Sequence, residues 1–391
     1  MMTVYAVGLF QGLALVAVPA ASSVLTSTSG YGLSDGEYGL LFVPQVLLAI
    51  AGSLAMPAMA RKVGVKRLLL VGIAVGALSM GLLTVSTTVQ HTGAALPLLL
   101  AATAALGFGF GVTLSCLSTI AGDLAPTAPE RSLTALNVFL GLGTALSPLL
   151  VGFLTRIGEW WYLPLLAASG LVVLAGIAWR QDLTVDGPAT RRPRGIPRAF
   201  WLFAAALVAY GICETMFGNW GTALLRDRGT SAATANYALA AFWAAVTAGR
   251  FIISVLPARV PSRAVYVVLP WAIAATLVLV ATVADGTAGI AVFAAAGFAC
   301  SGFFPMTIGY GEAAFPDVVV FVSGWLVAAY QVGYGLAAFG AGALDAVVPL
   351  GVLLAGAAAL AAGMGLLAVA VARVSHQDRA RQPPDANWET R

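Results

Sequence analysis

Long apolar blocks alternate along this chain with short polar segments that carry glycine, proline and charged residues. A helix needs about 20 apolar residues to cross the hydrocarbon core of a bilayer, where it satisfies its own backbone hydrogen bonds. Blocks of this length predict twelve membrane-spanning helices, at 3–28, 37–60, 67–88, 96–122, 132–155, 160–179, 199–225, 233–256, 264–284, 287–310, 318–343 and 348–372. The pattern therefore predicts an all-α integral membrane protein.

The composition agrees with this prediction. Of the 391 residues, 60% are hydrophobic and only 9% are charged. A single soluble core cannot bury that much apolar surface, whereas lipid can cover it. The first block lacks both a basic leading region and a small-residue cleavage site, so we expect a membrane helix there rather than a cleaved signal peptide.

The basic residues lie almost entirely on one predicted side of the membrane. With a cytoplasmic N-terminus, the outer loops hold only Arg156, Arg226 and Arg228. The inner loops and the tail hold all the other loop cations, which are Arg61, Lys62, Lys66, Arg67, Arg131, Arg180, Arg191, Arg192, Arg194, Arg198, Arg259, Arg263, Arg373, Arg379, Arg381 and Arg391. Because short cytoplasmic loops are enriched in Lys and Arg, we predict a plasma-membrane (inner-membrane) protein with both termini in the cytoplasm. The same scatter over separate loops does not suit a nucleic-acid-binding face.

The sequence contains no pattern that predicts catalysis or metal binding. We find no phosphate-binding loop, no nucleophile elbow and no zinc motif. The three cysteines, Cys116, Cys213 and Cys300, lie inside apolar blocks without the spacing of metal ligands. We therefore expect neither an enzyme nor a bound cofactor or metal.

The chain divides into two similar halves. The polar segment 181–198 contains three prolines and four arginines and separates six predicted helices from six. At an offset of 190 residues, Gly107, Pro126, Gly143 and Gly152 correspond to Gly297, Pro316, Gly333 and Gly342. We predict a six-helix bundle over 1–180, a cytoplasmic basic linker over 181–198, a second bundle over 199–375 and a cytoplasmic tail over 376–391. Parallel repeats of this kind occur in secondary transporters.

Two parallel six-helix halves joined by a basic inner loop resemble the major facilitator superfamily. The segment Ala60-Arg61-Lys62-Val63-Gly64-Val65-Lys66-Arg67 is similar to the superfamily's Gly-x-Leu-Ala-Asp-Arg-x-Gly-Arg-Arg loop between helices 2 and 3. Gly64, Lys66 and Arg67 fit this loop, whereas Arg61 stands at its acidic position. The resemblance implies the major facilitator fold, with two pseudo-symmetric bundles, and a gating role for Arg61, Lys66 and Arg67. Gly249-Arg250 in helix 8 is also a common superfamily pair.

Helix 7 carries a narrower resemblance. The pattern Tyr210-Gly211-x-x-Glu214-x-x-x-Gly218-x-Trp220 looks like helix 7 in relatives of the fucose–proton symporter family, and Phe304-Pro305 in helix 10 is similar to a pair seen there. That family's proton-handling acids lie in helices 1 and 4. Here helix 1 offers only Gln11 as a strong polar group, and helix 4 has no acid before Asp123. The resemblance therefore implies sugar-like transport without those two acids.

Glu214 is the only carboxylate well inside a predicted span. An ionisable group at that depth is costly and is usually functional. Removal from water favours the neutral acid, which lets such a group exchange protons. We expect Glu214 to be the proton-coupling site. The alternative is a structural carboxyl group that bonds a neighbouring helix.

Two further features of the second half suggest gates. Gly218-Asn219-Trp220-Gly221 is predicted to interrupt helix 7, because closely spaced glycines weaken a helix and free its backbone groups. Asn219 can share a site with Glu214 only if the helix is broken there, and Trp220 could stack on a sugar ring or anchor the helix. Arg250 is the only basic residue inside a span, so it could reach the inner surface, act at an inner gate or contact an anion.

Other polar side chains inside spans could contact a solute or bond helix to helix. They are Gln11, Gln45, Ser115, Ser118, Asn137, Tyr330, Gln331 and Tyr334. Gln331 and Tyr334 are three residues apart and share a helix face. With Asn219 and Trp220, this set suits a neutral or weakly polar solute.

The leading prediction is a secondary active transporter that takes up a small polar solute with protons by alternating access, the solute being sugar-like by resemblance only. Proton-coupled efflux of drugs or amphipathic metabolites is the first alternative, because the segment 143–152 loosely resembles a motif of superfamily antiporters. A non-transporting membrane sensor or scaffold is the second. We expect a monomer whose partners are a small-molecule substrate, protons and membrane lipid, with no nucleic acid.

Overall fold

The computed structural model describes residues 1–123, 129–183, 198–254, 261–283, 286–315, 319–344 and 347–381. The helices of the first half are α1 (Met2–Leu15), α2 (Ala17–Ala20), α3 (Ser22–Thr26), α4 (Asp35–Leu40), α5 (Phe42–Val63), α6 (Val65–Ser86), α7 (Ala95–Asp123), α8 (Pro129–Leu154) and α9 (Tyr162–Arg180). Those of the second half are α10 (Phe200–Gly218), α11 (Gly221–Asp227), α12 (Ala232–Ser254), α13 (Ser262–Val283), α14 (Gly286–Cys300), α15 (Phe303–Ala314), α16 (Val319–Leu344) and α17 (Leu350–Arg381). Two short 3₁₀ turns cover Thr87–Val89 and Thr155–Ile157.

The predicted all-α membrane architecture is confirmed. Within the described ranges, 11 helices are long and apolar enough to cross a membrane. The predicted first span differs, because Val16 and Ala21 divide it into the short pieces α1, α2 and α3. With these pieces the described helices follow the order of the twelve predicted spans. The last helix continues to Arg381, beyond the start that the sequence predicted for the tail.

Two spans of the second half are interrupted. The predicted interruption of helix 7 is confirmed, since α10 ends at Gly218 and α11 begins at Gly221. The predicted span 287–310, helix 10, is confirmed as one span over Ala288–Gly311, and it carries a break that the sequence did not predict: α14 ends at Cys300 and α15 begins at Phe303. The polar contacts of the candidate site gather around these two breaks.

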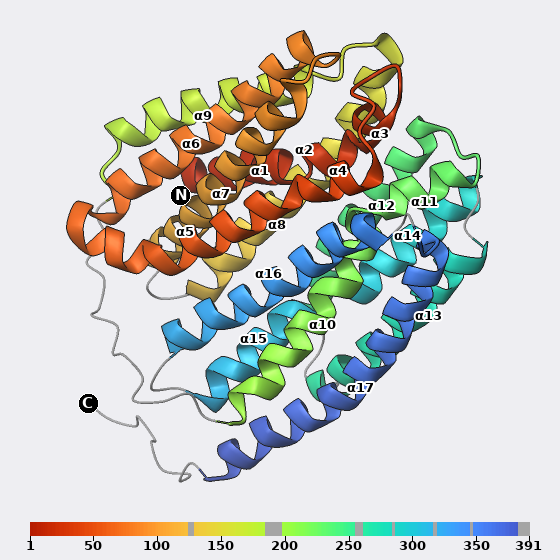
Figure 1. Cartoon of the computed structure of the whole chain (residues 1–391). Coiled ribbons are helices and arrows are strands. Elements are labelled where there is room, and N and C mark those ends of the chain that lie inside the picture. The colour runs from red at the N-terminus through yellow and green to blue at the C-terminus, as the bar shows by residue number, and fades with distance from the viewer. Residues whose placement is uncertain are drawn as a thin grey trace.

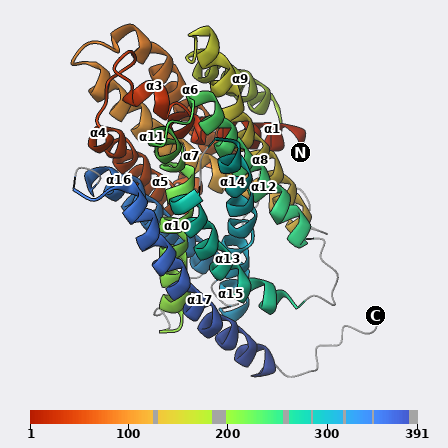
Figure 2. The same ribbon diagram turned by 90° about the vertical axis from the view of Figure 1, so that its right-hand side faces the viewer.

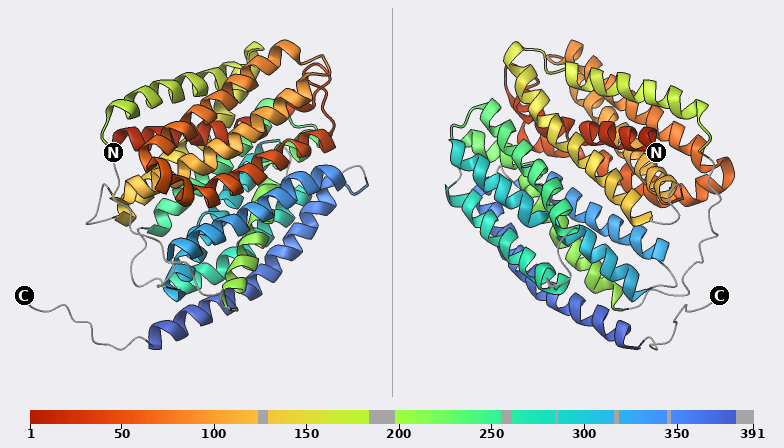
Figure 3. Two further views of the ribbon diagram at one scale, coloured as in Figure 1. Left: turned by 60° about the vertical axis from the view of Figure 1, so that its left-hand side comes forward. Right: turned by 180° about the vertical axis from the view of Figure 1, so that it is seen from behind.

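The helices form two bundles. Figure 1 shows the first half, coloured red to yellow-green, beside the second half, coloured green to blue, and Figure 3 shows the same division from two further sides. The halves meet where α8 packs on α12 and where α16 packs on α4 and α5, as Figure 2 shows for the latter group. Most of the predicted linker 181–198 lies outside the described residues.

The internal repeat corresponds to equivalent close helix contacts. A Cβ atom at Gly107 would lie 1.9 Å from the carbonyl oxygen of Gln45, and one at the repeat position Gly297 would lie 2.0 Å from that of Phe242. In the first half α7 thus approaches α5, and in the second half α14 approaches α12 in the same way. Gly143 and Gly333 make a second such pair: Gly143 on α8 packs against the backbone of α1, and Gly333 on α16 packs against the backbone of α10. Such approaches require glycine, as is common in membrane helix packing.

Among the described residues, side-chain hydrogen bonds join the two halves at one end of the bundle. We call the end that carries Lys66 and Arg180 the basic end, and the other the opposite end. At the opposite end, the Ser22 and Thr222 hydroxyls are 3.0 Å apart, and Arg226 Nη1 donates to Thr26 Oγ1 at 3.1 Å. Each bond joins the first half to the second, so this end of the interface is closed.

Candidate functional site

Glu214 lies at the centre of a buried cluster of tyrosines. Its side chain is only 3% exposed. The hydroxyl of Tyr210 donates to Glu214 Oε1 at 2.6 Å, and that of Tyr330 on α16 donates to Oε2 at 2.6 Å. Tyr210 is four residues before Glu214 and therefore shares its helix face. Each carboxylate oxygen thus has a short hydrogen bond, one from its own helix and one from α16.

The Tyr210 hydroxyl is also bound to the break in helix 10. It lies 2.8 Å from the carbonyl oxygen of Cys300, the last residue of α14, whose carbonyl is freed by the end of the helix. A phenol carries one proton and can donate to one of these two acceptors at a time. If Glu214 is ionised, Tyr210 donates to Glu214. If Glu214 is protonated on Oε1, it donates to Tyr210, which then donates to Cys300.

Asn219 joins this cluster because helix 7 is broken. Its Nδ2 donates to the hydroxyl of Tyr334 at 3.1 Å, and the side chain of Gln45 from the first half lies against the same hydroxyl. Tyr334 is one turn from Tyr330 on α16, so the face that binds Glu214 also binds Asn219. The structure therefore brings together five predicted site residues, Gln45, Glu214, Asn219, Tyr330 and Tyr334.

Trp220 is part of the closed opposite end. It is 1% exposed, and its Nε1 donates to the carbonyl of Ala337 on α16 at 3.2 Å. Its ring packs edge-on against Tyr38 of α4, with centroids 5.4 Å apart, and the Tyr38 hydroxyl donates to the carbonyl of Asn219 at 3.4 Å. Trp220 seals the two halves together.

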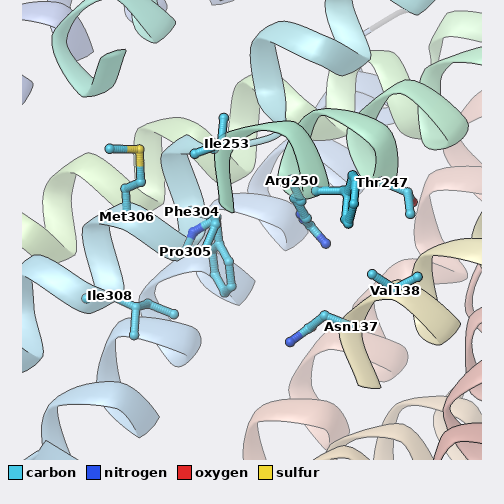
Figure 4. Close-up of a pocket in the computed structure, with 12 residues that line it drawn as sticks. Asn137, Val138, Thr247, Arg250, Ile253, Phe304, Pro305, Met306 and Ile308 are labelled. Atoms are coloured by element: carbon cyan, nitrogen blue, oxygen red, sulfur yellow. The ribbon is translucent and has the colours of Figure 1, made fainter. Parts of the chain in front are cut away.

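A cavity of ≈ 440 Å³ opens between the halves toward the basic end. It lies between α8 of the first half and α12 and α15 of the second (Figure 4). Its lining is mostly apolar and consists of Asn137, Val138, Thr247, Arg250, Phe251, Ile253, Gly302, Phe304, Pro305, Met306, Ile308 and Gly309. The volume is within the range of small-molecule sites. Closure at one end and a cavity at the other define a conformation that faces the basic end.

Arg250 lines this cavity and reaches the break in helix 10. Its Nε donates to the carbonyl oxygen of Ser301 at 3.3 Å, next along the chain from the carbonyl that Tyr210 contacts. Because side chains lean toward the N-terminus of their helix, Arg250 on α12 points away from the basic end. Among the described residues, no ion pair joins Arg250 to Glu214.

The remaining predicted site residues lie apart from the cluster. Gln11 is fully buried against Gly76 of α6, inside the first bundle, and within the described chain its amide atoms have no hydrogen-bond partner. Asn137 lines the cavity, and Gln331 is half-buried on α16. Gly218 packs on Trp243, and Gly221 packs on Phe293.

Of the predicted gating loop, two side chains are described. Lys66 Nζ donates to the carbonyl of Gln181, which ties the start of α6 to the end of α9. Arg67 is exposed. The side chain of Arg61 lies outside the described residues. The Lys66 contact stays within the first half.

Sequence reasoning missed two parts of the site. It did not assign a role to Tyr210, although its spacing of four from Glu214 was a signal that the two could bond. It also missed the break at Ser301 and Gly302. Gly302 and Pro305 were a local signal for this break, because Pro305 cannot bond the Ser301 carbonyl, whereas the groups that bind the freed carbonyls come from distant helices.

The comparisons agree with this architecture. The model of the Major Facilitator Superfamily matches residues 4–316, and the chain belongs to that family. Among solved structures, it is similar to a mutant of the nucleoside transporter NupG, with 12% identity, a TM-score of 0.75 and coverage of 95% of this chain and 99% of that one. It is also similar to a bacterial homolog of the human lysosomal transporter Spinster in an inward-facing and occupied conformation, with 15% identity, a TM-score of 0.64 and 98% coverage of both chains.

At these identities the similarity to solved structures concerns the fold. Among curated protein sequences, none matches this chain. The family assignment makes the protein a multi-pass membrane transporter of a small molecule and not an enzyme.

Proposed function

We propose that this transporter takes up a small polar organic solute together with protons, by alternating access, and that Glu214 is the proton site. The observation that carries the proposal is the shared hydrogen bond of Tyr210. When Glu214 is protonated on Oε1, its carboxyl group donates to the Tyr210 oxygen, and the Tyr210 hydroxyl turns its own hydrogen bond to the Cys300 carbonyl. One proton thereby changes how helix 7 is bonded to the break of helix 10, so a protonation event has a direct mechanical consequence.

The described conformation fits one state of such a cycle. The opposite end is closed by Trp220 and Tyr38, and the cavity lies toward the basic end. The distribution of Arg and Lys favours a cytoplasmic basic end and a plasma-membrane location, so this state would release solute into the cell. A cysteine placed at Ala189 in the linker tests this orientation, since labelling from outside intact cells would contradict it.

For the opposite end to open, Trp220 and Tyr38 must separate. The break between Gly218 and Gly221 lies beside Trp220, which makes these glycines the natural hinge of the outer gate. Lys66 and Arg67, with Arg61, belong to the gating loop by family resemblance. The fucose-symporter-like pattern of helix 7 and the Phe304-Pro305 pair on the cavity wall support a sugar-like solute. One proton moving down 100 mV supplies about 2.3 kcal/mol, enough for a roughly fortyfold solute gradient.

The test is Glu214→Gln, which keeps the volume and mimics the protonated acid. A thermal-shift screen of sugars, polyols, organic acids and drugs first supplies a solute, because a ligand of the folded state raises the melting temperature. In liposomes with an acidic exterior, we expect the variant to lose proton-driven accumulation. Exchange of labelled for unlabelled solute should persist, because this exchange needs no proton release.

Two results decide the proposal. Wild-type accumulation by Glu214→Gln would make the carboxyl group structural, and coupling would then need a group at the membrane edge. Loss of both accumulation and exchange would point to misfolding, which the melting temperature of the purified variant reveals. Tyr330→Phe then serves as a second variant, since it keeps Glu214 and removes one of its two hydrogen bonds.

A second candidate is proton-coupled export of amphipathic compounds. The apolar lining of the cavity, from Phe304, Met306 and Ile308 among others, favours it. Cells that carry the protein would then resist toxic amphipathic compounds and would not accumulate labelled sugars. Uptake and resistance assays on the same cells separate the two directions.

A further inference from the structure

Arg250 carries a charge that the described chain does not neutralise by contact. Its guanidinium has five N–H donors, and the structure uses one of them, in the bond from Nε to Ser301. None of the described carboxylates forms an ion pair with it. A cation at membrane depth is costly without a partner, and cations in such positions commonly mark ligand sites.

The free face of Arg250 borders the cavity. Figure 4 shows Arg250 and Asn137 projecting into it from α12 and α8 of the two halves. Phe304, Met306 and Ile308 form its apolar wall on α15. A guanidinium beside an amide, facing an apolar wall, matches a small organic molecule that has a carboxylate at one end and a less polar body.

We propose that the transported solute is a monoanion whose carboxylate binds Arg250. This inference rests on the proposed function, since it names the substrate class of the same transport cycle. The negative charge of the solute meets the unused guanidinium donors, and its body packs on the α15 wall. Because Arg250 and Asn137 belong to different halves of the protein, a bound solute also bridges them.

The charges of Glu214, Arg250 and the solute then explain why the solute would move together with a proton. The titratable neighbours of Glu214 are Tyr210 on its own helix, Tyr330 and Tyr334 on α16, and Cys300 on α14, all of which are ordinarily neutral at pH 7. Among the described residues inside spans, Glu214 and Arg250 therefore set the net charge of the site. Empty, with Glu214 ionised, this charge is zero.

Loading preserves that neutrality only when both ligands bind. A carboxylate at Arg250 makes the site −1, and a proton on Glu214 returns it to zero. Moving a net charge through the low-dielectric centre is unfavourable, so the empty and doubly loaded states are the ones that reorient. The transport of one anion with one proton is electroneutral, and this distinguishes it from the symport of a neutral sugar with a proton.

Binding is tested with matched pairs of probes on the purified full-length protein. The probes are lactate, gluconate, glucuronate and benzoate, each beside its neutral amide. At saturation we expect at least one carboxylate to raise the melting temperature by a few degrees, with no rise from its amide. If no carboxylate stabilises the protein, or if an amide does so equally, the inference is wrong.

Two variants, Arg250→Gln and Arg250→Lys, test whether the preference for a carboxylate depends on Arg250. Arg250→Gln should abolish the preference for carboxylate over amide, and Arg250→Lys should retain part of it, because lysine keeps the charge and loses the fork of donors. Retention of the full preference by Arg250→Gln overturns the role of Arg250. If Arg250→Gln does not fold, Arg250→Lys and the comparison of acid with amide on the wild type still decide.

The membrane potential separates this inference from the proposed function. In liposomes with an acidic exterior, accumulation of the best carboxylate should be the same at 0 and at about −100 mV inside. A neutral solute carried with a proton would instead gain roughly fortyfold from that potential. Such a gain overturns the anion inference and leaves proton coupling standing. If the pH gradient drives nothing, proton coupling fails, while carboxylate binding that depends on Arg250 would still support the anion site.

Discussion

Gly342 offers the sharpest test of the closed opposite end. It lies on α16 against the start of α4 in the other half. A Cβ atom at Gly342 would lie 2.3 Å from the carbonyl oxygen of Asp35 and 2.8 Å from Cη2 of Trp220. The first contact is with backbone and the second with a side chain that is 1% exposed, so neither can yield easily. We therefore expect Gly342→Ala to force the two halves apart at this end.

The size of the effect follows from the overlap. Overpacking by one methyl group costs about 1–3 kcal/mol. Since about 1.4 kcal/mol is tenfold, the balance between the two transport states should shift by roughly 5- to 150-fold away from this conformation. If about nine-tenths of the wild-type molecules adopt the described conformation, a penalty of about 2 kcal/mol leaves roughly a quarter of the variant molecules in it.

A single introduced cysteine can report this population. Val138 lines the cavity, whereas Cys116, Cys213 and Cys300 are fully buried and should react slowly. We expect maleimide labelling of Val138→Cys in detergent to fall about fourfold when Gly342→Ala is added, by the populations above.

Gly340→Ala is the matched control. Gly340 is on the same helix, and a Cβ atom there would meet nothing within 4 Å. It therefore carries the same gain in helix propensity without the overlap, and labelling should not change. Equal labelling rates in the two alanine variants would refute the reasoning that this contact holds the opposite end closed.

Two further substitutions test the hydrogen bonds and the packing inside the halves. Tyr210→Phe should reduce uptake driven by a pH gradient and lower the melting temperature more than Tyr330→Phe does, because it removes the only hydroxyl in the described chain within reach of both Glu214 Oε1 and the Cys300 carbonyl, a loss of about 1–3 kcal/mol. Equal melting temperatures would contradict this double role of Tyr210. Gly107→Ala should destabilise the protein by about 1–3 kcal/mol through overlap with the backbone of helix 2, as thermal unfolding would show. Gly81→Ala, with open space around its Cβ, is the control, and a similar loss there would mean that the Gly107 contact is not specific.

The break in helix 7 could be predicted because its cause is local. Gly218 and Gly221 weaken the helix wherever it packs, and the structure ends α10 and begins α11 at these residues. Glu214 stood out for a similar reason, since the only carboxylate well inside a span is visible from the sequence. The sequence predicted only one of its two hydrogen-bond partners as a site residue, Tyr330, and assigned no role to Tyr210.

The break in helix 10 has a local cause that the sequence analysis did not use. Pro305 has no N–H to bond the Ser301 carbonyl four residues earlier, and Gly302 lies between the two residues. Only the tertiary structure shows which groups bind the freed carbonyls, as a membrane protein requires. Those groups are Tyr210 and Arg250, which come from other helices 90 and 51 residues away. Gln11 shows the same limit, because a helix that is apolar on every side does not reveal which face a polar residue will occupy.

The sequence by itself determined the number and order of the membrane helices, the repeat that relates the halves and the position of the single intramembrane acid. These features follow from requirements that each segment meets alone, such as apolar length and internally satisfied backbone bonds. The tertiary structure decided which end is closed, that Tyr210 links Glu214 to the helix-10 break, and that Arg250 faces the cavity. These depend on pairings between distant segments, which hydrophobic periodicity does not encode.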